Sequence, residues 1–466
     1  MHAAVATPVA PTPSEALLRR MDRPGPRYTS YPTADRFSEA VGPERLLEAL
    51  RARRTRDAGP LAVYVHIPFC ESVCYYCACN KIVTRHHERA ADYLADLGRE
   101  LDLQVEALGP GQPLHSLHLG GGSPTFLSDD ELAALMARFL AVFRFTPDAE
   151  VSIEVDPRTV DAQRLAHLRT IGFNRISFGV QDFDPAVQVA VHRVQPYEQV
   201  EALVRNARAL GFQSINVDLI YGLPKQTAES FRRTIAQVAA LRPDRIALYA
   251  YAHLPTRFKP QRRIVSADLP PPGDRVQMIA GALASFVGHG YVAIGMDHFA
   301  LPDDALAVAR REGRLRRNFQ GYTTLPDGDL LALGVSAIGR MGDAHTQNAK
   351  TLDAYHVALR EGRLPVERGY ALSADDLLRR EVVMALMCQG RVDLRAAGAH
   401  HGVDAAAVLA PELERLAPFV EEGLATVDGP VVEVTPLGWL FVRAIAMVFD
   451  AYLPPGAAVE RFSRIV

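Results

Sequence analysis

Between residues 61 and 251, short apolar runs alternate with longer stretches in which apolar residues recur every three or four positions. The short runs have the length and apolar content of buried strands, and the longer stretches have the spacing of amphipathic helices. Strands are predicted at 61–66, 116–120, 150–155, 174–179, 214–220 and 245–251, and helices at 88–108, 128–144, 158–171 and 227–241. This alternation predicts parallel βαβ units in a barrel or an open sheet, whose chemistry lies at the carboxyl ends of the strands.

The flanking segments follow other patterns. The N-terminal segment is rich in proline and arginine, and its motif PGPRYTSYPTADRF indicates an extended arm that packs on another part of the chain. Beyond residue 255 we expect one more strand at 291–299 and loops at 316–324 and 334–339. The last segment is mostly helical, with a hairpin signal near 427–436 that predicts a small β-wing. We therefore expect an arm, a catalytic domain and a helical C-terminal domain, at 1–60, 61–350 and 351–466.

Composition and net charge limit the classes of function and partner to be expected. The chain has 466 residues and a formal net charge of −3, which argues against nucleic acid as a main partner. We expect neither a signal peptide nor a membrane span, because the N-terminus lacks a basic leader and no apolar run is long enough, so the expected location is the cytoplasm. All but four of the 51 basic residues are arginine, which indicates either a biased genomic base composition or carboxylate binding.

Four of the five cysteines lie within ten residues, in YVHIPFCESVCYYCACN, directly after the first predicted strand. So tight a group indicates metal or redox chemistry rather than a disulfide framework. Three thiolates are too few for structural zinc, but on a 4Fe-4S cluster they leave one iron open to an outside ligand. We therefore predict Cys70, Cys74 and Cys77 as cluster ligands, with zinc or an unrelated redox centre as the alternative. Cys79 is either a fourth ligand or an active-site neighbour, and its closeness to Cys77 favours the second.

Polar residues follow the ends of successive predicted strands. Each alone is explained by a tight turn or a surface ion pair, but their recurrence favours a cofactor site at one end of the strands. Asp218 stands out, because a carboxylate inside an apolar run is costly unless it is paired or binds a ligand. The polar residues are Glu154, Gln181, Asp182, His192, Arg193 and Asp218; at the end of the second strand, Gly121 and Gly122 let the backbone approach a ligand closely.

The cysteine motif resembles that of the radical S-adenosylmethionine superfamily. Over nearly its whole length the chain resembles the oxygen-independent coproporphyrinogen III oxidases, also called coproporphyrinogen dehydrogenases. The arm and the additional Cys79 are the most discriminating features, since haem-chaperone-like relatives typically lack both. The matching motifs are PRYTSYPTA (26–34), YVHIPFCESVCYYCACNK (64–81), GGGSPT (120–125), EVDP (154–157), GVQDF (179–183), DLIYGLP (218–224), IGMDHFA (294–300) and RNFQGYT (317–323).

This resemblance implies a partial (β/α)6 TIM-like barrel and an anaerobic oxidoreductase of porphyrin and haem biosynthesis. A reduced 4Fe-4S cluster cleaves S-adenosylmethionine, and the resulting 5′-deoxyadenosyl radical takes a hydrogen from a substrate propionate. Two propionates of coproporphyrinogen III become vinyl groups in turn, which gives protoporphyrinogen IX. The resemblance also implies two molecules of S-adenosylmethionine, an electron donor such as flavodoxin or ferredoxin, and a monomer.

The resemblance also implies residue roles. The first S-adenosylmethionine is expected at Tyr64, Gly121, Glu154 and Ile338. The second is expected at Tyr76, Gly122, Ser123, Gln181, Arg193, Asp218 and Ala252. Ser123 stands where the family usually has threonine, which keeps the hydroxyl.

Substrate contacts are harder to place. Four substrate carboxylates call for arginines near the mouth of the barrel, and Arg27 and Arg317 lie within matched motifs, although either also fits an ordinary surface position. Three other functions stay open: a radical methyltransferase, a haem chaperone on the same scaffold, and a simple electron carrier. The arm at 26–34 and the motifs IGMDHF and RNFQGYT favour the oxidase.

Overall fold

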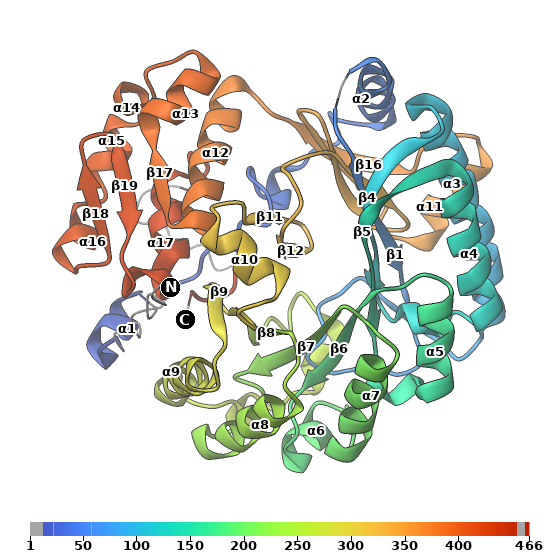
Figure 1. Cartoon of the computed structure of the whole chain (residues 1–466), viewed down its shortest axis with the longest axis horizontal. Helices are drawn as coiled ribbons and strands as arrows, with labels where there is room; N and C mark the ends of the chain where they lie inside the picture. Colours follow the sequence, from blue (N-terminus) through green and yellow to red (C-terminus); the bar gives the residue numbers. More distant parts are fainter. Residues whose placement is uncertain (1–12, 22, 57, 454–461, 466) are drawn as a thin grey trace, which may run out of the picture.

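The computed structural model describes residues 13–21, 23–56, 58–453 and 462–465. Its centre is a curved sheet of twelve strands (Figure 1). Besides β13 (Leu330–Leu333), which pairs in parallel with β1, six neighbouring strands of this sheet are parallel, which confirms the predicted α/β fold built from a partial barrel. They are β1 (Leu61–Ile67), β4 (Gln112–Gly121), β5 (Phe143–Val155), β6 (Arg175–Gln181), β7 (Ser214–Tyr221) and β8 (Arg245–Ala250).

Helices cover the outer face of these strands (Figure 1). The predicted helix at 88–108 is α3, with the same bounds, but the helix predicted from 158 begins only at Ala162. It begins there because the Asp161 side chain caps it, while Pro157–Thr159 form a separate 3-10 turn. The helices of this region are α3 (Glu88–Leu108), α4 (Asp129–Val142), α5 (Ala162–Thr170), α6 (Pro185–Ala190), α7 (Tyr197–Ala209), α8 (Ala228–Leu241), α9 (Pro272–Gly288), α10 (Ala305–Arg311) and α11 (Leu352–Arg360).

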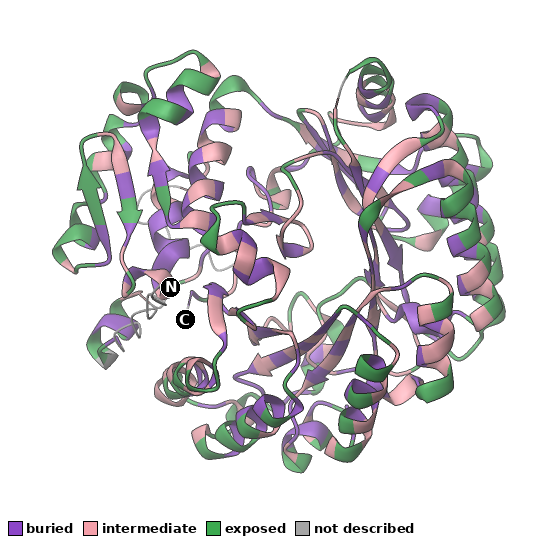
Figure 2. Ribbon diagram, viewed as in Figure 1, coloured by how far each residue is buried: buried purple, intermediate pink, exposed green. Residues whose placement is uncertain are grey.

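The two faces of the parallel strands differ in chemistry. In β7, Ile215, Val217 and Leu219 are fully buried, whereas the alternating Asn216 and Asp218 are only partly buried and line a cavity inside the barrel. Figure 2 shows buried strands at the centre and exposed residues on the outer faces of the helices. Because side chains alternate across a strand, one face packs under the helices and the other forms a polar lumen.

Further strands extend the sheet at both edges. The segment predicted as one strand at 291–299 is instead a pair of antiparallel strands, because the chain turns at Met296, whose φ is +49°. The segment 316–324, predicted as a loop, is a short hairpin. The strands that extend the sheet are β9 (Val292–Gly295), β10 (His298–Ala300), β13 (Leu330–Leu333), β14 (Ile338–Met341), β15 (Ala344–Asn348) and β16 (Val366–Ala371). The hairpin of β11 (Arg316–Asn318) and β12 (Gly321–Thr323) is a separate two-stranded sheet.

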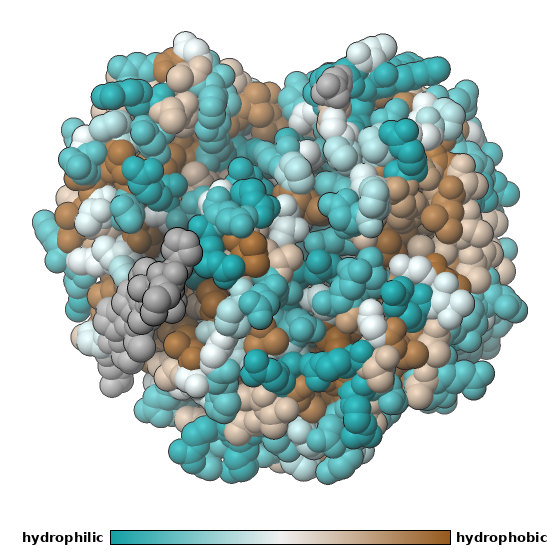
Figure 3. Space-filling view, in the orientation of Figure 1, coloured by the Kyte–Doolittle hydropathy of each residue, from teal (hydrophilic) through white to brown (hydrophobic). Residues whose placement is uncertain are grey.

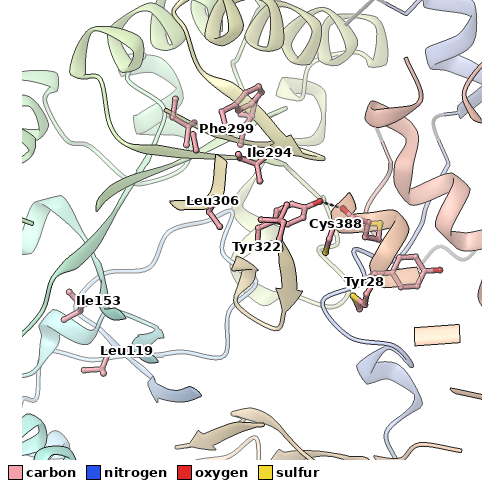
Figure 4. Packing of buried hydrophobic residues seen from close by; sticks show 14 of the residues in the cluster. Tyr28, Leu119, Ile153, Ile294, Phe299, Leu306, Tyr322 and Cys388 are labelled. Atoms are coloured by element: carbon pink, nitrogen blue, oxygen red, sulfur yellow. Dashed lines mark hydrogen bonds between the residues drawn. The ribbon is translucent and has the colours of Figure 1, made fainter. Parts of the chain in front are cut away.

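The C-terminal region is mostly helical and carries a three-stranded sheet that includes the predicted hairpin. The main sheet passes the boundary expected at residue 350, since β16 pairs with β15. Tyr322 of β12 donates a hydrogen bond to the carbonyl of Met387 beside the buried Cys388, which joins the β11–β12 hairpin to α12 (Figure 4). The elements are α12 (Ala374–Gln389), α13 (Leu394–His401), α14 (Ala405–Val408), α15 (Ala410–Glu414), α16 (Ala417–Glu421), α17 (Val442–Ala446), β17 (Arg391–Asp393), β18 (Ala425–Asp428) and β19 (Val431–Val434).

The N-terminal arm runs from α1 (Glu15–Met21) beside the C-terminal region to α2 (Pro43–Thr55) beside the barrel (Figure 1). Tyr28 is buried and donates to Asp450, and the Arg443 guanidinium donates to the backbone of Gly25 and Pro26. The arm therefore packs on the C-terminal region, as its motif predicts. Figure 3 shows a notch between this region and the barrel. In the described part of the chain, no helix is long and apolar enough to span a bilayer.

Candidate active site

The cysteine loop leaves the carboxyl end of β1 and is closed by parallel pairing of β2 (Phe69–Cys70) with β3 (Ile82–Val83). All its cysteines are free thiols. Cys74 is buried, and Cys70 and Cys77 are partly exposed. Burial, followed by the nearby Cys77 and Cys74, raises the pKa of Cys70 to about 12. The three predicted ligands therefore lie close enough to influence one another.

Cys79 is exposed and lies beside Cys77. A hydrogen bond between these two thiols lowers the pKa of Cys77 to about 6. Cys79 also interacts electrostatically with Glu154 and Tyr64. It thus faces the residues expected to bind the cofactor, and its exclusion from the ligand set stays a prediction.

Two guanidinium groups face the sulfur of Cys74. Its Sγ lies 3.4 Å from Arg193 Nη1 and 3.6 Å from Arg158 Nη2. Asp156 holds both arginines, with Oδ2 at 3.0 Å from Arg193 Nη1 and 2.6 Å from Arg158 Nη2. Although burial opposes it, the charges of Arg193 and Arg158 lower the pKa of Asp156, so all three groups are ionised at neutral pH.

This donor set fits an iron–sulfur cluster. Thiolates bound to such a cluster are anionic, and donors near the sulfurs are the surroundings that tune one. Among the residues that the structure describes, no three His, Cys, Asp or Glu side chains converge on a single-metal site. A cluster with a separate iron at each corner does not need that convergence.

The glycine triplet packs directly against the cysteine loop. A Cβ on Gly122 would lie 2.6 Å from the Pro68 carbonyl oxygen, and Gly121 has φ +114°. The amide of Gly122 donates to Ile67, and the amide of Gly121 donates to Glu154. Glycine is needed here because side chains would push the two loops apart.

Glu154 is the penultimate residue of β5, and its carboxylate contacts residues of the neighbouring β4. His118 Nε2 lies 3.3 Å from Glu154 Oε1, and the His118 ring stacks on Tyr64 at 5.9 Å. The Tyr64 hydroxyl lies 3.0 Å from His66 Nδ1. Burial opposes ionisation of Glu154, but hydrogen bonds from His118 and Gly121 lower its pKa. An anionic carboxylate therefore faces the space beside the cysteine loop.

Asp218 lies in the same lumen. Its carboxylate accepts hydrogen bonds from Ser177 Oγ and Asn216 Nδ2, both at 2.9 Å. Burial and the negative charge of Glu154 raise the pKa of Asp218 to about 6. One cavity is lined by both carboxylates and by other inward residues of β4 to β8. The structure thus brings together two carboxylates that the sequence singles out separately.

The other predicted cofactor residues lie around this centre. Arg193 donates to the carbonyl of Gly179, and Gln181 ends β6 with φ +70°. Tyr76 is electrostatically coupled to Arg193 and to the cysteines. Ser123 is buried, and its amide donates to Phe69. Ala252 follows β8, and Ile338 begins β14, two strands from β1 in the sheet.

Arg27 and Arg317 lie away from the cysteine loop. Arg27 pairs with Asp297 at 2.5 Å and lies over the Tyr249 ring at 5.1 Å. Arg317 donates to the Arg27 carbonyl and covers the Tyr322 ring at 4.6 Å. Both are bound to protein groups where the arm, the β11–β12 hairpin and the barrel meet, and their substrate role stays a prediction.

Four residues of the site were missed in the sequence. His66 and His118 lie on inward faces of strands, and Asp156 and Arg158 follow Glu154 at alternate positions. The motif EVDPR carries a signal for the last two, because it places charges two and four residues beyond a strand-end glutamate. The contacts of His118 with Tyr64 and Glu154 cross between strands and leave no local pattern.

Comparison with known proteins agrees with this geometry. Residues 64–238 match the model of the radical SAM superfamily, and residues 372–441 match that of the HemN C-terminal domain. The chain is 47% identical to an oxygen-independent coproporphyrinogen III oxidase of Pseudomonas aeruginosa, over 97% of this chain and 98% of the relative. It is 48% identical to that of Escherichia coli K12, over the same shares.

A solved structure of a related protein has the same fold. The structure described as coproporphyrinogen III oxidase (HemN) from Escherichia coli, a radical SAM enzyme, superposes with a TM-score of 0.90 at 47% identity. The match covers 94% of this chain and 99% of that one. The likeness therefore includes the arm and the C-terminal region as well as the barrel.

Proposed function

The chain belongs to the oxygen-independent coproporphyrinogen III oxidases, and from this membership we propose how its residues serve the reaction. It is a radical S-adenosylmethionine enzyme that oxidises coproporphyrinogen III without oxygen in haem biosynthesis. Two propionates lose CO2 and become vinyl groups. The observation that carries the site assignment is the thiol of Cys74, held between two arginines in the loop on which the glycine triplet packs.

Cys70, Cys74 and Cys77 hold the 4Fe-4S cluster. A 4Fe-4S cluster held by these thiolates would supply the electron for reductive cleavage of S-adenosylmethionine. Arg158 and Arg193 offset the negative charge at Cys74, and Asp156 fixes both guanidinium groups. The chain thus supplies position and electrostatics at the thiolates.

The cationic cofactor binds between the carboxylates and the glycine triplet. Tyr64, Gly121, Glu154 and Ile338 hold one S-adenosylmethionine. Glu154 is ionised, and its charge favours the ammonium and sulfonium groups of that molecule. A second molecule binds at Tyr76, Gly122, Ser123, Gln181, Arg193, Asp218 and Ala252.

The substrate enters the polar lumen, which is lined by Glu154 and Asp218. Arg27 and Arg317, at the arm and the hairpin, contribute positive charge toward its carboxylates. The enzyme acts as a cytoplasmic monomer and takes electrons from a small carrier such as flavodoxin or ferredoxin.

An anaerobic turnover experiment tests this function. The reconstituted enzyme, S-adenosylmethionine, a reductant and coproporphyrinogen III are combined, and products are followed by mass spectrometry. We expect 5′-deoxyadenosine together with the divinyl tetrapyrrole. Deoxyadenosine with a methylated tetrapyrrole would indicate the methyltransferase instead, and haem binding without cleavage would indicate the chaperone.

A further inference from the structure

The end of the lumen opposite the cysteine loop carries two arginines. Arg175 begins β6 and Arg245 begins β8, and both line the cavity that also contains Glu154 and Asp218. Glu150 marks this end on β5, four residues before Glu154, which places the two ends about 13 Å apart at the usual strand rise. A ligand about 13 Å long that lies along the lumen from the cofactor end would reach these arginines.

Each arginine has one acidic partner and spare donors. Arg175 Nη2 lies 2.8 Å from Glu150, and Arg245 Nε lies 2.9 Å from Asp304. Asp304 also caps α10, so its charge is shared with a backbone amide. Within the described residues, Arg175 Nη1 and Arg245 Nη2 are buried and have no hydrogen-bond partner.

A buried guanidinium nitrogen without a hydrogen-bond partner lowers the stability of the folded protein. Buried polar atoms are nearly always hydrogen-bonded, so two exceptions on neighbouring cations need an explanation. The two arginines also repel each other: burial and the charge of Arg245 lower the pKa of Arg175. One more carboxylate would satisfy the donors and relieve the repulsion, and arginine suits planar carboxylates best.

We propose that Arg175 and Arg245 form a carboxylate receptor that binds a propionate of the tetrapyrrole remote from the propionate that reacts. The inference rests on the proposed function, because it takes its ligand from that substrate. Holding one rim carboxylate at the far end fixes which propionate reaches the cofactor end. The receptor thus positions the substrate and takes no part in bond breaking.

The test is the affinity of the reconstituted holoenzyme for coproporphyrin III, a fluorescent tetrapyrrole with the same four propionates. Arg175→Gln and Arg245→Gln should each weaken binding about 10- to 100-fold, the usual effect of losing a charged hydrogen bond. Glu150→Gln should bind equally or more tightly, because it frees Arg175. Arg164→Gln is the control, since Arg164 is similarly buried but pairs with Asp129 outside the lumen.

The affinity of the same variants for S-adenosylmethionine is also measured. It shows whether the two arginines bind a propionate of the tetrapyrrole or the carboxylate of S-adenosylmethionine, and it shows whether the variants are folded. It should stay at the wild-type value. Unchanged coproporphyrin affinity in both arginine variants would overturn the receptor. Equal loss of coproporphyrin affinity in Glu150→Gln and Arg175→Gln would also overturn it, because that result indicates a purely structural ion pair. A selective loss of S-adenosylmethionine affinity would overturn it as well. If wild-type enzyme neither bound nor converted the tetrapyrrole, the proposed function itself would fail.

Discussion

Replacing Arg158 with leucine should make the cluster harder to reduce. Arg158 Nη2 lies 3.6 Å from Cys74 Sγ and 2.6 Å from Asp156 Oδ2, and its side chain is only 20% exposed. A hydrogen-bond donor with positive charge stabilises the reduced, more negative state of a cluster. Arg158→Leu removes both contributions while Arg193 keeps its contact with Cys74.

The size of the shift in midpoint potential follows from the contact between Arg158 and Cys74. A hydrogen bond to a charged group contributes about 1.5–3 kcal/mol, and the long, partly exposed contact of Arg158 places it at the lower end. For a one-electron couple, about 1.4 kcal/mol corresponds to about 60 mV. The midpoint potential of Arg158→Leu should therefore fall by about 60 mV.

The assay is a potentiometric titration followed by electron paramagnetic resonance. Arg158→Lys, which keeps the charge, should shift the potential by less than half as much as the leucine variant. Arg164→Leu removes a neighbouring arginine that contacts the Leu127 carbonyl instead of the cluster loop and should leave the potential unchanged. A wild-type potential in Arg158→Leu, or equal shifts in all three variants, would refute the reasoning.

Other predictions concern the ligand set and stability. Cys79→Ser should keep the wild-type iron and sulfide content after reconstitution while Cys74→Ser loses most of it; loss in both would make Cys79 a ligand. Burial raises the pKa of Glu100 to about 7, above about 4.3 in the unfolded chain, so stability falls as pH rises between these values, by up to about 4 kcal/mol. Glu100→Gln should remove that part of the pH dependence in urea unfolding at about pH 5 and pH 8, and an unchanged slope would contradict it. Arg27→Met leaves Asp297 buried without its guanidinium and should cost about 2 kcal/mol or more in the same assay, with partial recovery when Asp297→Asn is added; additive losses would argue against the pair.

The spacing of apolar residues along the chain was sufficient to predict the parallel strands and most of their helices, because each of these elements buries a regular set of apolar side chains. It failed at 291–299, where a positive φ at Met296 splits one apolar run into two strands. It also failed at 316–324, because a three-residue strand is too short to show alternation. Glu154 was predictable from its place near a strand end and Asp218 from its place inside an apolar run, but Arg175 and Arg245 begin their strands, and only the three-dimensional arrangement of the lumen shows their spare donors.

Isotope transfer tests the central claim most directly. Coproporphyrinogen III deuterated at the β-carbons of its propionates is given to the reconstituted enzyme with S-adenosylmethionine and a reductant, and the 5′-deoxyadenosine is analysed by mass spectrometry. If the 5′-deoxyadenosyl radical takes the propionate hydrogen, deuterium appears in the deoxyadenosine that accumulates alongside the divinyl product, and none appears when Cys74→Ser replaces the wild-type enzyme. Divinyl product accompanied by unlabelled deoxyadenosine would contradict this claim.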